Sequence, residues 1–421
     1  MNNKNYSQYN KLKKYEAKGL SMTDSHSIVL EKAKGSKLWD VDGNSYIDMC
    51  SGFGSLPLGH SYPQEVLRSS ENKETKEQSW QLIQGMGDVY SSKDKIALLE
   101  LVCSVLPFSS AKGGLCVGGA QAVELAVKSA HLFTKNTGVI SFSNAYHGLD
   151  LGVLAFASRK DFRSPFINLY RQDIVKRLPF ACGEEVIVAA LEEQRSKGIG
   201  TCAILLEPIQ GRGGGYKPPK AWLKRLKQLA TAYGALVVYD EIFTGFGRCG
   251  RLFCLEDASD CDIICLGKAM AGGMPLAGCF AKAEIMDAWK ECSEPIYTGT
   301  YFGHPLSCFV GYKTIKTIID SRLDERSLKL GIKIQDFLYK RLNTFPIIKD
   351  LRVHGLFIVI DFCIDGFGVQ LMQELRRNLV IAIPSGVNGG ALSLTPALNI
   401  PEDLLWEALD CVVCCIKKIS Y

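Results

Sequence analysis

The sequence predicts an α/β fold in which a large domain with a mostly parallel central sheet is joined to a small α+β domain formed by both chain ends. Two observations support this prediction. Between about residues 95 and 290, short apolar runs alternate with helical patterns, which is typical of a parallel sheet with helical crossovers. Outside this region the chain opens with a hairpin pattern and closes with helices and a strand pair. We place the small domain at residues 1–60 and 311–421 and the large domain at 61–310.

The N-terminal segment 35-GSKLWDVDGNSYIDM-49 predicts a hairpin, because Asp42 and Gly43 separate two strand-like runs. Residues 219–234 predict a helix, because a proline opens the segment and a glycine closes it. The strands of the central sheet are predicted from apolar runs at residues 114–117, 138–143, 202–208, 235–241, 262–267 and 277–282.

The composition predicts a soluble, cytoplasmic protein. The chain has 421 residues, of which 47% are apolar and 22% are charged, and its net charge of +5 argues against a nucleic-acid or membrane partner. No stretch approaches the roughly 20 apolar residues of a membrane helix. The polar, lysine-containing N-terminus lacks the apolar segment of a signal peptide.

The chain contains 16 cysteines, which we expect to be reduced and mostly buried, because no secretory signal is present. The spacing of Cys249, Cys254, Cys261 and Cys265 is not the CxxC pairing of zinc sites, so no metal site is expected.

Polar groups follow several of the predicted strands, at the carboxyl ends where sheets of this kind bind their ligands. Gly119 and Ala120 follow the first strand and open a helix, so their backbone N–H groups could hold a phosphate, although a plain tight turn explains the glycines equally well. Tyr146 and His147 follow the next strand, where an ordinary loop is the alternative.

The segment 262-DIICLGKAMAGGMPLAG-278 ends an apolar strand on Lys268. A lysine in this place either marks where the strand leaves the core or is needed for its reactive amine. Asp240 also follows an apolar strand, 28 positions earlier, so both groups should lie at the same edge of the sheet. A reactive lysine, a carboxylate for the pyridine nitrogen and a phosphate-binding turn together suit pyridoxal phosphate. A dry pocket would lower the lysine pKa and leave free amine.

Two nucleotide-binding interpretations are disfavoured. The apolar strand that ends in Asp240 and Glu241 resembles a Walker B strand, but the chain contains no GxxxxGK[ST] loop, which an ATPase would need. The glycines of 209-IQGRGGGYKPP-219 do not open a helix directly, as a dinucleotide fingerprint would.

These residues resemble the class III, or ω-type, aminotransferases of fold type I. The similarity runs from about residue 30 to 400 and is most specific in 240-DEIFTGFGRCG-250 and 266-LGKAMAGG-273. It implies an enzyme that uses pyridoxal 5'-phosphate to move an amino group from an amino acid or amine donor to a 2-oxo acid, in two half-reactions through Lys268. A racemase or epimerase on the same site is the nearest alternative, and a cofactor-binding regulator without activity is a third.

Carried over position by position, the resemblance implies that Lys268 binds the cofactor covalently and moves the proton, and that Asp240 pairs with the pyridine nitrogen. It implies a homodimer with sites at the subunit interface, because one phosphate contact comes from the neighbouring subunit. The other implied cofactor contacts are Gly119 and Ala120 at the phosphate, Tyr146 and Ile242 on the two ring faces, Glu207 beside the ring, and Thr300 at the neighbouring subunit's phosphate.

The chain departs from the family pattern where a substrate carboxylate is usually bound. Ser393 occupies the position of the usual arginine, and Arg212 stands where many members have a glutamate that pairs with that arginine. A separate departure is Phe243, which stands where many members have a glutamine near the ring oxygen of the cofactor. We hypothesise that Arg212 binds the substrate carboxylate from a different wall of the site; the alternative is that it is a solvated loop residue.

Overall fold

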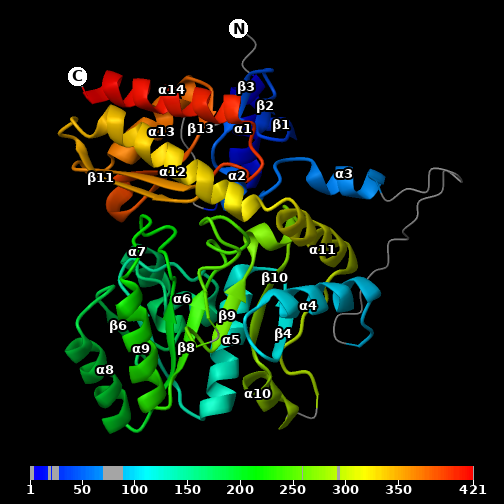
Figure 1. The fold of residues 1–421 in the computed structure, drawn as a ribbon, viewed down its shortest axis with the longest axis vertical. Helices are drawn as coiled ribbons and strands as arrows, with labels where there is room; N and C mark the ends of the chain where they lie inside the picture. The colour runs from blue at the N-terminus through cyan, green and yellow to red at the C-terminus, as the bar shows by residue number, and fades with distance from the viewer. Residues whose placement is uncertain are drawn as a thin grey trace, which may run out of the picture.

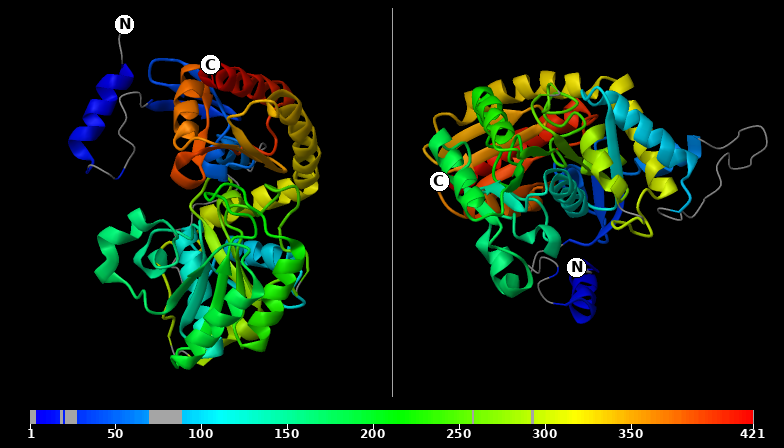
Figure 2. Two further views of the ribbon diagram at one scale, coloured as in Figure 1. Left: turned by 90° about the vertical axis from the view of Figure 1, so that its left-hand side faces the viewer. Right: turned by 90° about the horizontal axis from the view of Figure 1, so that it is seen from below.

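The computed structural model describes residues 4–17, 20, 28–69, 89–257, 259–291 and 294–420. The middle of the chain surrounds a seven-stranded sheet, and the two chain ends come together at one end of the molecule (Figure 1). A second direction shows the same arrangement, with the N-terminal helix projecting beside the strands of the chain ends (Figure 2). The predicted α/β architecture is therefore confirmed, whereas the boundaries at residues 60 and 310 stay a prediction.

The central sheet has six strands that run in one direction and one, β10, that runs antiparallel to its neighbours. All residues of its inner strands β5, β7, β8 and β9 are buried, as expected for strands with helices on both faces. From one edge to the other, the order is β4 (Ala111–Cys116), β10 (Ala277–Lys282), β9 (Ile263–Leu266), β8 (Leu236–Asp240), β7 (Thr201–Leu206), β5 (Gly138–Phe142) and β6 (Val175–Leu178).

The six strands predicted for this sheet are all present, with ends displaced by at most three residues. The sequence pattern does not predict β6, because two of its four residues are charged and it lies at the edge of the sheet, where only Leu178 is buried. Edge strands need no continuous apolar run, since one of their sides faces solvent.

Helices cover the two faces of the sheet with separate apolar clusters. α5 (Gly119–Thr134) packs on one face together with Ala203 of β7, whereas α8 (Glu184–Ser196) and α9 (Lys220–Ala232) pack on the other face together with Ile204. This alternation follows from the two-residue period of a strand. α9 confirms the helix predicted over residues 219–234.

Both chain ends contribute to one of the two smaller sheets. The predicted hairpin is confirmed as the antiparallel pair of β2 and β3, and β13 from the C-terminal part pairs in parallel with β3. The first small sheet has the order β1 (Leu30–Lys34), β2 (Lys37–Asp40), β3 (Ser45–Asp48) and β13 (Val380–Ile381). The second has the order β11 (Ile348–His354), β12 (Phe357–Phe362), β15 (Ala391–Leu394) and β14 (Ile383–Ser385).

The remaining helices connect these sheets, and several of them are short. In the described ranges, no helix combines the length and the apolar character that crossing a membrane requires, and each described cysteine is a free thiol. These helices are α1 (Lys4–Tyr15), α2 (Ser51–Gly54), α3 (Tyr62–Ser69), α4 (Lys93–Val105), α6 (Leu151–Leu154), α7 (Lys160–Arg163), α10 (Ala283–Met286), α11 (Pro305–Asp320), α12 (Leu323–Leu342), α13 (Phe367–Arg377) and α14 (Glu402–Ser420), with the 3-10 segments η1 (Ser164–Leu169), η2 (Lys268–Ala271), η3 (Asp287–Glu291) and η4 (Val387–Gly389).

Candidate active site

The carboxyl edge of the central sheet brings Asp240 and Lys268 together. Asp240 is the last residue of β8 and lies opposite Cys265 of the neighbouring parallel strand β9. Lys268 follows β9 after one residue, Gly267, and is the first residue of η2. The charges of Asp240 and Glu207 both act on the Lys268 amine, so the three groups share one site.

Lys268 is held in an unusual backbone conformation and is partly shielded from water. Its φ angle is 41°, in the left-handed region that a lysine rarely adopts without support from its surroundings. Its Nζ lies 5.3 Å from the ring centre of Phe243, and no carboxylate in the described ranges is within ion-pair distance of it. Desolvation lowers the pKa of Lys268, although the charges of Asp240 and Glu207 oppose this effect. More of the amine is therefore uncharged near neutral pH than in a solvated lysine.

Asp240 is oriented by a buried histidine that the sequence interpretation did not assign to the site. The Nδ1–H of His147 donates to Oδ2 of Asp240 at 2.7 Å, and the backbone N–H of Ile242 donates to Oδ1 at 3.1 Å. Both side chains are buried, and Nε2 of His147 has no partner in the described part of the chain. The position of His147 at a strand end was visible in the sequence, but nothing there indicated that it contacts Asp240.

Glu207 ties two loops of the site together. It follows β7, and its two oxygens accept the backbone N–H groups of Tyr146 at 2.9 Å and Gly211 at 2.8 Å. Burial raises the pKa of Glu207 to about 7, with the nearby charge of Asp240 adding to the effect and His147 opposing it. Its two hydrogen bonds join the loop after β5, which carries Tyr146, to the loop after β7, which carries Gly211.

The start of α5 is a glycine turn that packs against Ile242. Oε1 of Gln121 accepts the N–H groups of Val117 at 3.1 Å and Gly118 at 3.2 Å. As the first residues of the helix, Gly119 and Ala120 have no intrahelical acceptors for their own N–H groups. A methyl group added at Gly119 would lie 3.0 Å from Cδ1 of Ile242, so Ile242 packs directly against this turn.

An aromatic and cationic layer lies over the loop after β7. The rings of Tyr146 and Phe162 meet edge to face at 6.4 Å, and Cζ of Arg212 lies 5.2 Å from the first ring centre and 5.1 Å from the second. Arg212 is exposed and forms no ion pair with any described residue. Ser393, by contrast, is buried with its hydroxyl bonded to Ser385, so its side chain is already engaged.

Thr300 is not brought to the other predicted site residues within this chain. It is exposed and lies between Tyr297 and Phe302, which pack on the α5 side of the sheet. The Tyr297 hydroxyl donates to the backbone oxygen of Gln121 at 3.0 Å. No contact of the described residues joins Thr300 to Lys268 or Asp240.

Glu241, next to Asp240, serves the fold rather than the site. Its oxygens accept the backbone N–H groups of Cys254 and Leu255, each at 2.7 Å, and the hydroxyl of Thr244 at 3.0 Å. The side chain is fully buried, and burial raises its pKa from 4.5 to about 7. Glu241 thus closes the loop between β8 and β9.

The raised pKa of Glu241 predicts that the stability of the fold depends on pH. Between about pH 4.5 and 7, the folded state keeps a proton on Glu241 that the unfolded chain has released. The contribution of Glu241 to the free energy of unfolding is therefore complete below pH 4.5 and is lost as the pH rises to about 7. In E241Q the difference in unfolding free energy between about pH 5 and pH 8 should shrink by up to about 3 kcal/mol. Urea unfolding at both pH values measures it, with E284Q, which changes an exposed glutamate, as control. If E241Q showed the same difference in unfolding free energy between the two pH values as the wild type, Glu241 would not be the group responsible.

Comparisons with known proteins agree on one family. The family model described as Aminotransferase class-III matches residues 20–416. The chain is 28% identical to a probable 4-aminobutyrate aminotransferase of Bacillus subtilis, with 94% of each chain covered. It is 30% identical to an acetylornithine aminotransferase of Methanothermobacter thermautotrophicus, covering 91% of this chain and 92% of the relative. Among solved structures, a transaminase from the marine bacterium Virgibacillus has a TM-score of 0.86 at 22% identity, covering 98% of this chain and 99% of its own.

Proposed function

The chain belongs to the class III aminotransferase family, and from this membership we propose which of its residues carry out the amino-group transfer and hold the substrate. The reaction moves an amino group from an amino donor to an oxo acid. The observation that carries the residue assignment is the juxtaposition of a desolvated, unpaired amine on Lys268 with the buried Asp240–His147 pair.

The residues of the site fit pyridoxal phosphate, the cofactor of this family. The amine of Lys268 is partly buried and desolvated, and it has no counter-ion in the described ranges, so it is free to form a covalent bond to the cofactor. The N–H groups of Gly119 and Ala120 offer donors to a phosphate at a helix N-terminus. When bound, the cofactor supplies an aldehyde that takes up the amino group and a ring that accepts electrons.

Lys268 would hold the cofactor covalently and then transfer the proton between the donor carbon and the cofactor. Its lowered pKa favours the uncharged amine, which is the form that attacks a carbonyl and accepts a proton. The strained backbone at Lys268 fixes the start of η2, so the side chain leaves the sheet edge in one direction.

Asp240 would keep the pyridine nitrogen protonated, with His147 as the residue that positions it. The bond from His147 Nδ1–H and the bond from the N–H of Ile242 leave the carboxylate in a fixed orientation at the end of β8. A carboxylate fixed in this orientation can accept a hydrogen bond from a neighbouring ring nitrogen.

The remaining residues would enclose the cofactor. Ile242 and Tyr146 would cover the two ring faces, and Glu207 would fix the loops that carry Tyr146 and the substrate residues. Thr300 is exposed and makes no contact with the Lys268 site of its own chain, which supports a role at the phosphate of a neighbouring subunit in a homodimer.

Arg212 would bind the substrate carboxylate. Its guanidinium lies over Tyr146 and Phe162, and it has no ion-pair partner in the described part of the chain. Ser393 cannot replace a guanidinium, because its hydroxyl is buried against Ser385. The chain would therefore prefer donors that carry a carboxylate.

Replacing Arg212 by alanine should raise the KM for an ω-amino acid by about 10- to 100-fold, because a charge-assisted hydrogen bond contributes about 1.5–3 kcal/mol. The KM for the alkyl amine of the same length, which lacks the carboxylate, should change less than about twofold. Lys217→Ala, which removes a cation from the same loop, is the matched control. Equal effects on both donors would exclude Arg212 as the carboxylate site.

The activity itself is tested by titrating the purified, cofactor-loaded protein with a panel of amino acids, diamines and amines while recording its visible absorbance. A donor that converts the cofactor to its amine form, reversed by a 2-oxo acid, identifies the donor class. Exchange of the donor's α-hydrogen with deuterated water without that conversion would instead indicate racemisation.

A further inference from the structure

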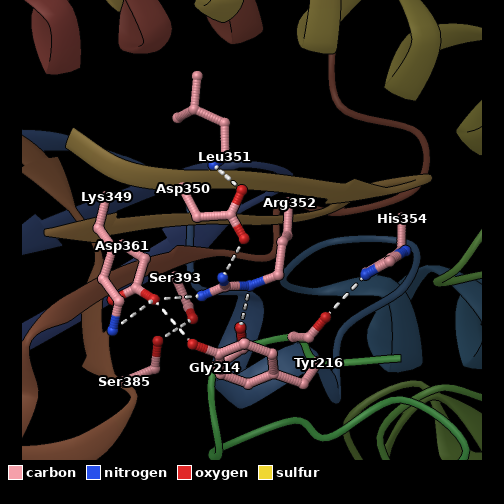
Figure 3. Close-up of polar contacts among 11 residues, drawn as sticks. Gly214, Tyr216, Lys349, Asp350, Leu351, Arg352, His354, Asp361, Ser385 and Ser393 are labelled. Carbon is pink, nitrogen blue, oxygen red and sulfur yellow. Dashed lines mark hydrogen bonds and ion pairs between the residues drawn. The ribbon is translucent and has the colours of Figure 1, made fainter. Parts of the chain in front are cut away.

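The loop Gly211–Tyr216, which carries Arg212, is clamped from outside the central sheet by a polar cluster on β11 and β12 (Figure 3). Nε of Arg352 donates to the backbone oxygen of Gly214 at 2.7 Å, and its Nη2 donates to Oδ2 of Asp361 at 2.8 Å. The hydroxyl of Tyr216 donates to the same carboxylate oxygen at 3.0 Å. One guanidinium therefore joins the loop backbone to the strand β12.

Further contacts hold the loop at neighbouring points. The guanidinium of Arg352 stacks on the ring of Tyr216, with 4.0 Å from Cζ to the ring centre. His354 donates from Nε2 to the backbone oxygen of Gly215 at 2.8 Å, and the N–H of Gly386 donates to the backbone oxygen of Arg212 at 3.0 Å. The residues that hold the loop from outside, Arg352, His354 and Gly386, all lie more than 130 positions after it in the sequence.

The clamp is shielded from water and closely packed. The side chains of Arg352 and Asp361 are only 11% and 10% exposed, so their ion pair is largely shielded from water. Arg352 also pairs with Asp350, and Nζ of Lys349 lies 4.0 Å from Oδ2 of Asp361. Gly214 and Gly215 have φ angles of 108° and 74°, and a methyl group at Gly215 would lie 2.9 Å from Val359 of β12. The loop therefore rests directly on the sheet, in a backbone shape that its glycines permit.

The opposite side of this loop faces the active site. The N–H of Gly211 donates to Glu207, and the side chain of Arg212 lies over Tyr146. A displacement of the loop would move both the carboxylate-binding cation and a hydrogen-bond partner of Glu207. The contacts from β11 therefore bear on the position of Arg212.

We propose that Arg352 is a positioning residue for the substrate: by fixing Gly214 against Asp361 and Tyr216, it sets the place of the Arg212 guanidinium over Tyr146. The inference rests on the proposed role of Arg212 and deepens it, because substrate selection then depends on a strand of the C-terminal sheet as well as on the site itself.

The test uses the cofactor-loaded enzyme and compares R352A with K349A. Lys349 also approaches Asp361, at 4.0 Å, but is mostly exposed and does not contact the loop. In R352A, amide hydrogen exchange in a peptide covering residues 211–216 should accelerate at least about tenfold, and the KM for an ω-amino acid should rise about 10- to 100-fold. K349A should change neither quantity, and R352K should restore part of the affinity through its remaining charge.

A double-mutant cycle separates positioning from a general loss of stability. If Arg352 acts through Arg212, the variant R212A/R352A should have the KM of R212A alone, within about twofold. Additive effects, or equal loop exchange in R352A and K349A, would overturn the proposal. Should R352A fail to fold, Y216F tests the same clamp by removing only the hydroxyl bond to Asp361. An unchanged KM in R212A would contradict the proposed function, while faster loop exchange in R352A would still establish the clamp.

Discussion

Replacing Lys268 by alanine is expected to lower kcat for transamination by about 10⁴-fold or more. The variant loses both the covalent attachment and the general acid and base of the proton transfer, each of which contributes several orders of magnitude. The effect should not depend on the donor, because it concerns the chemistry and not substrate recognition. The loss of kcat is measured as a steady-state rate, with the donor that the absorbance titration identifies.

Chemical labelling identifies the lysine that binds the cofactor covalently, independently of any rate measurement. Borohydride reduction should add the mass of the reduced cofactor to the peptide that contains Lys268 in the wild-type enzyme and to no peptide in K268A. K268R is the matched variant, since it keeps a cation but offers no free amine, and it should be as inactive as K268A. Labelling of another lysine, or activity in K268A above about 1% of the wild type, would refute the assignment of Lys268.

Replacing Asp240 by asparagine is expected to lower kcat by roughly 10²- to 10⁴-fold while leaving covalent attachment to Lys268 intact. Asparagine keeps the shape of the side chain but not its charge, so the pyridine nitrogen is no longer held in its protonated form. Each 1.36 kcal/mol of lost transition-state stabilisation lowers the rate tenfold, so this range corresponds to about 3–5 kcal/mol. The exposed variant D257N, in the loop between β8 and β9, is the control and should retain wild-type rates.

A cofactor analogue distinguishes this electrostatic role from a loss of structure. A pyridoxal phosphate methylated at the ring nitrogen carries a permanent positive charge and does not need a carboxylate to stay charged. D240N reconstituted with this analogue should regain part of its rate relative to D240N with the natural cofactor. If the analogue gives no gain and the variant binds neither form, Asp240 has a structural role instead.

The sequence predicted the elements whose residues lie close together in the chain. The apolar runs of β8 and β9 are continuous, and each ends at a chemically unusual residue, so Asp240 and Lys268 could be expected at one edge of the sheet. The place of Gly119 at the start of a helix could be predicted for the same reason, because a strand, a glycine turn and a helix follow one another in the sequence.

Contacts between distant segments could not be predicted in this way. His147 and Asp240 are 93 positions apart, and Arg352 and Gly214 are 138 positions apart, so no local pattern indicates that they meet. Such pairs depend on how strands are ordered and on how one sheet rests on another. The family resemblance does not supply them either, because it names residues that touch the cofactor and not those that hold these residues in place.

The pairing of β3 with β13 has a consequence for how the protein is made. Ile47 meets Val380, and the hydroxyl of Thr395 donates to the backbone oxygen of Cys50, 345 positions earlier. All strands of the central sheet lie between residues 111 and 282, so that sheet can form during translation while the N-terminal hairpin still waits for its last strand. Until residue 380 leaves the ribosome, β3 therefore has an unpaired edge to which a strand of another nascent chain could add.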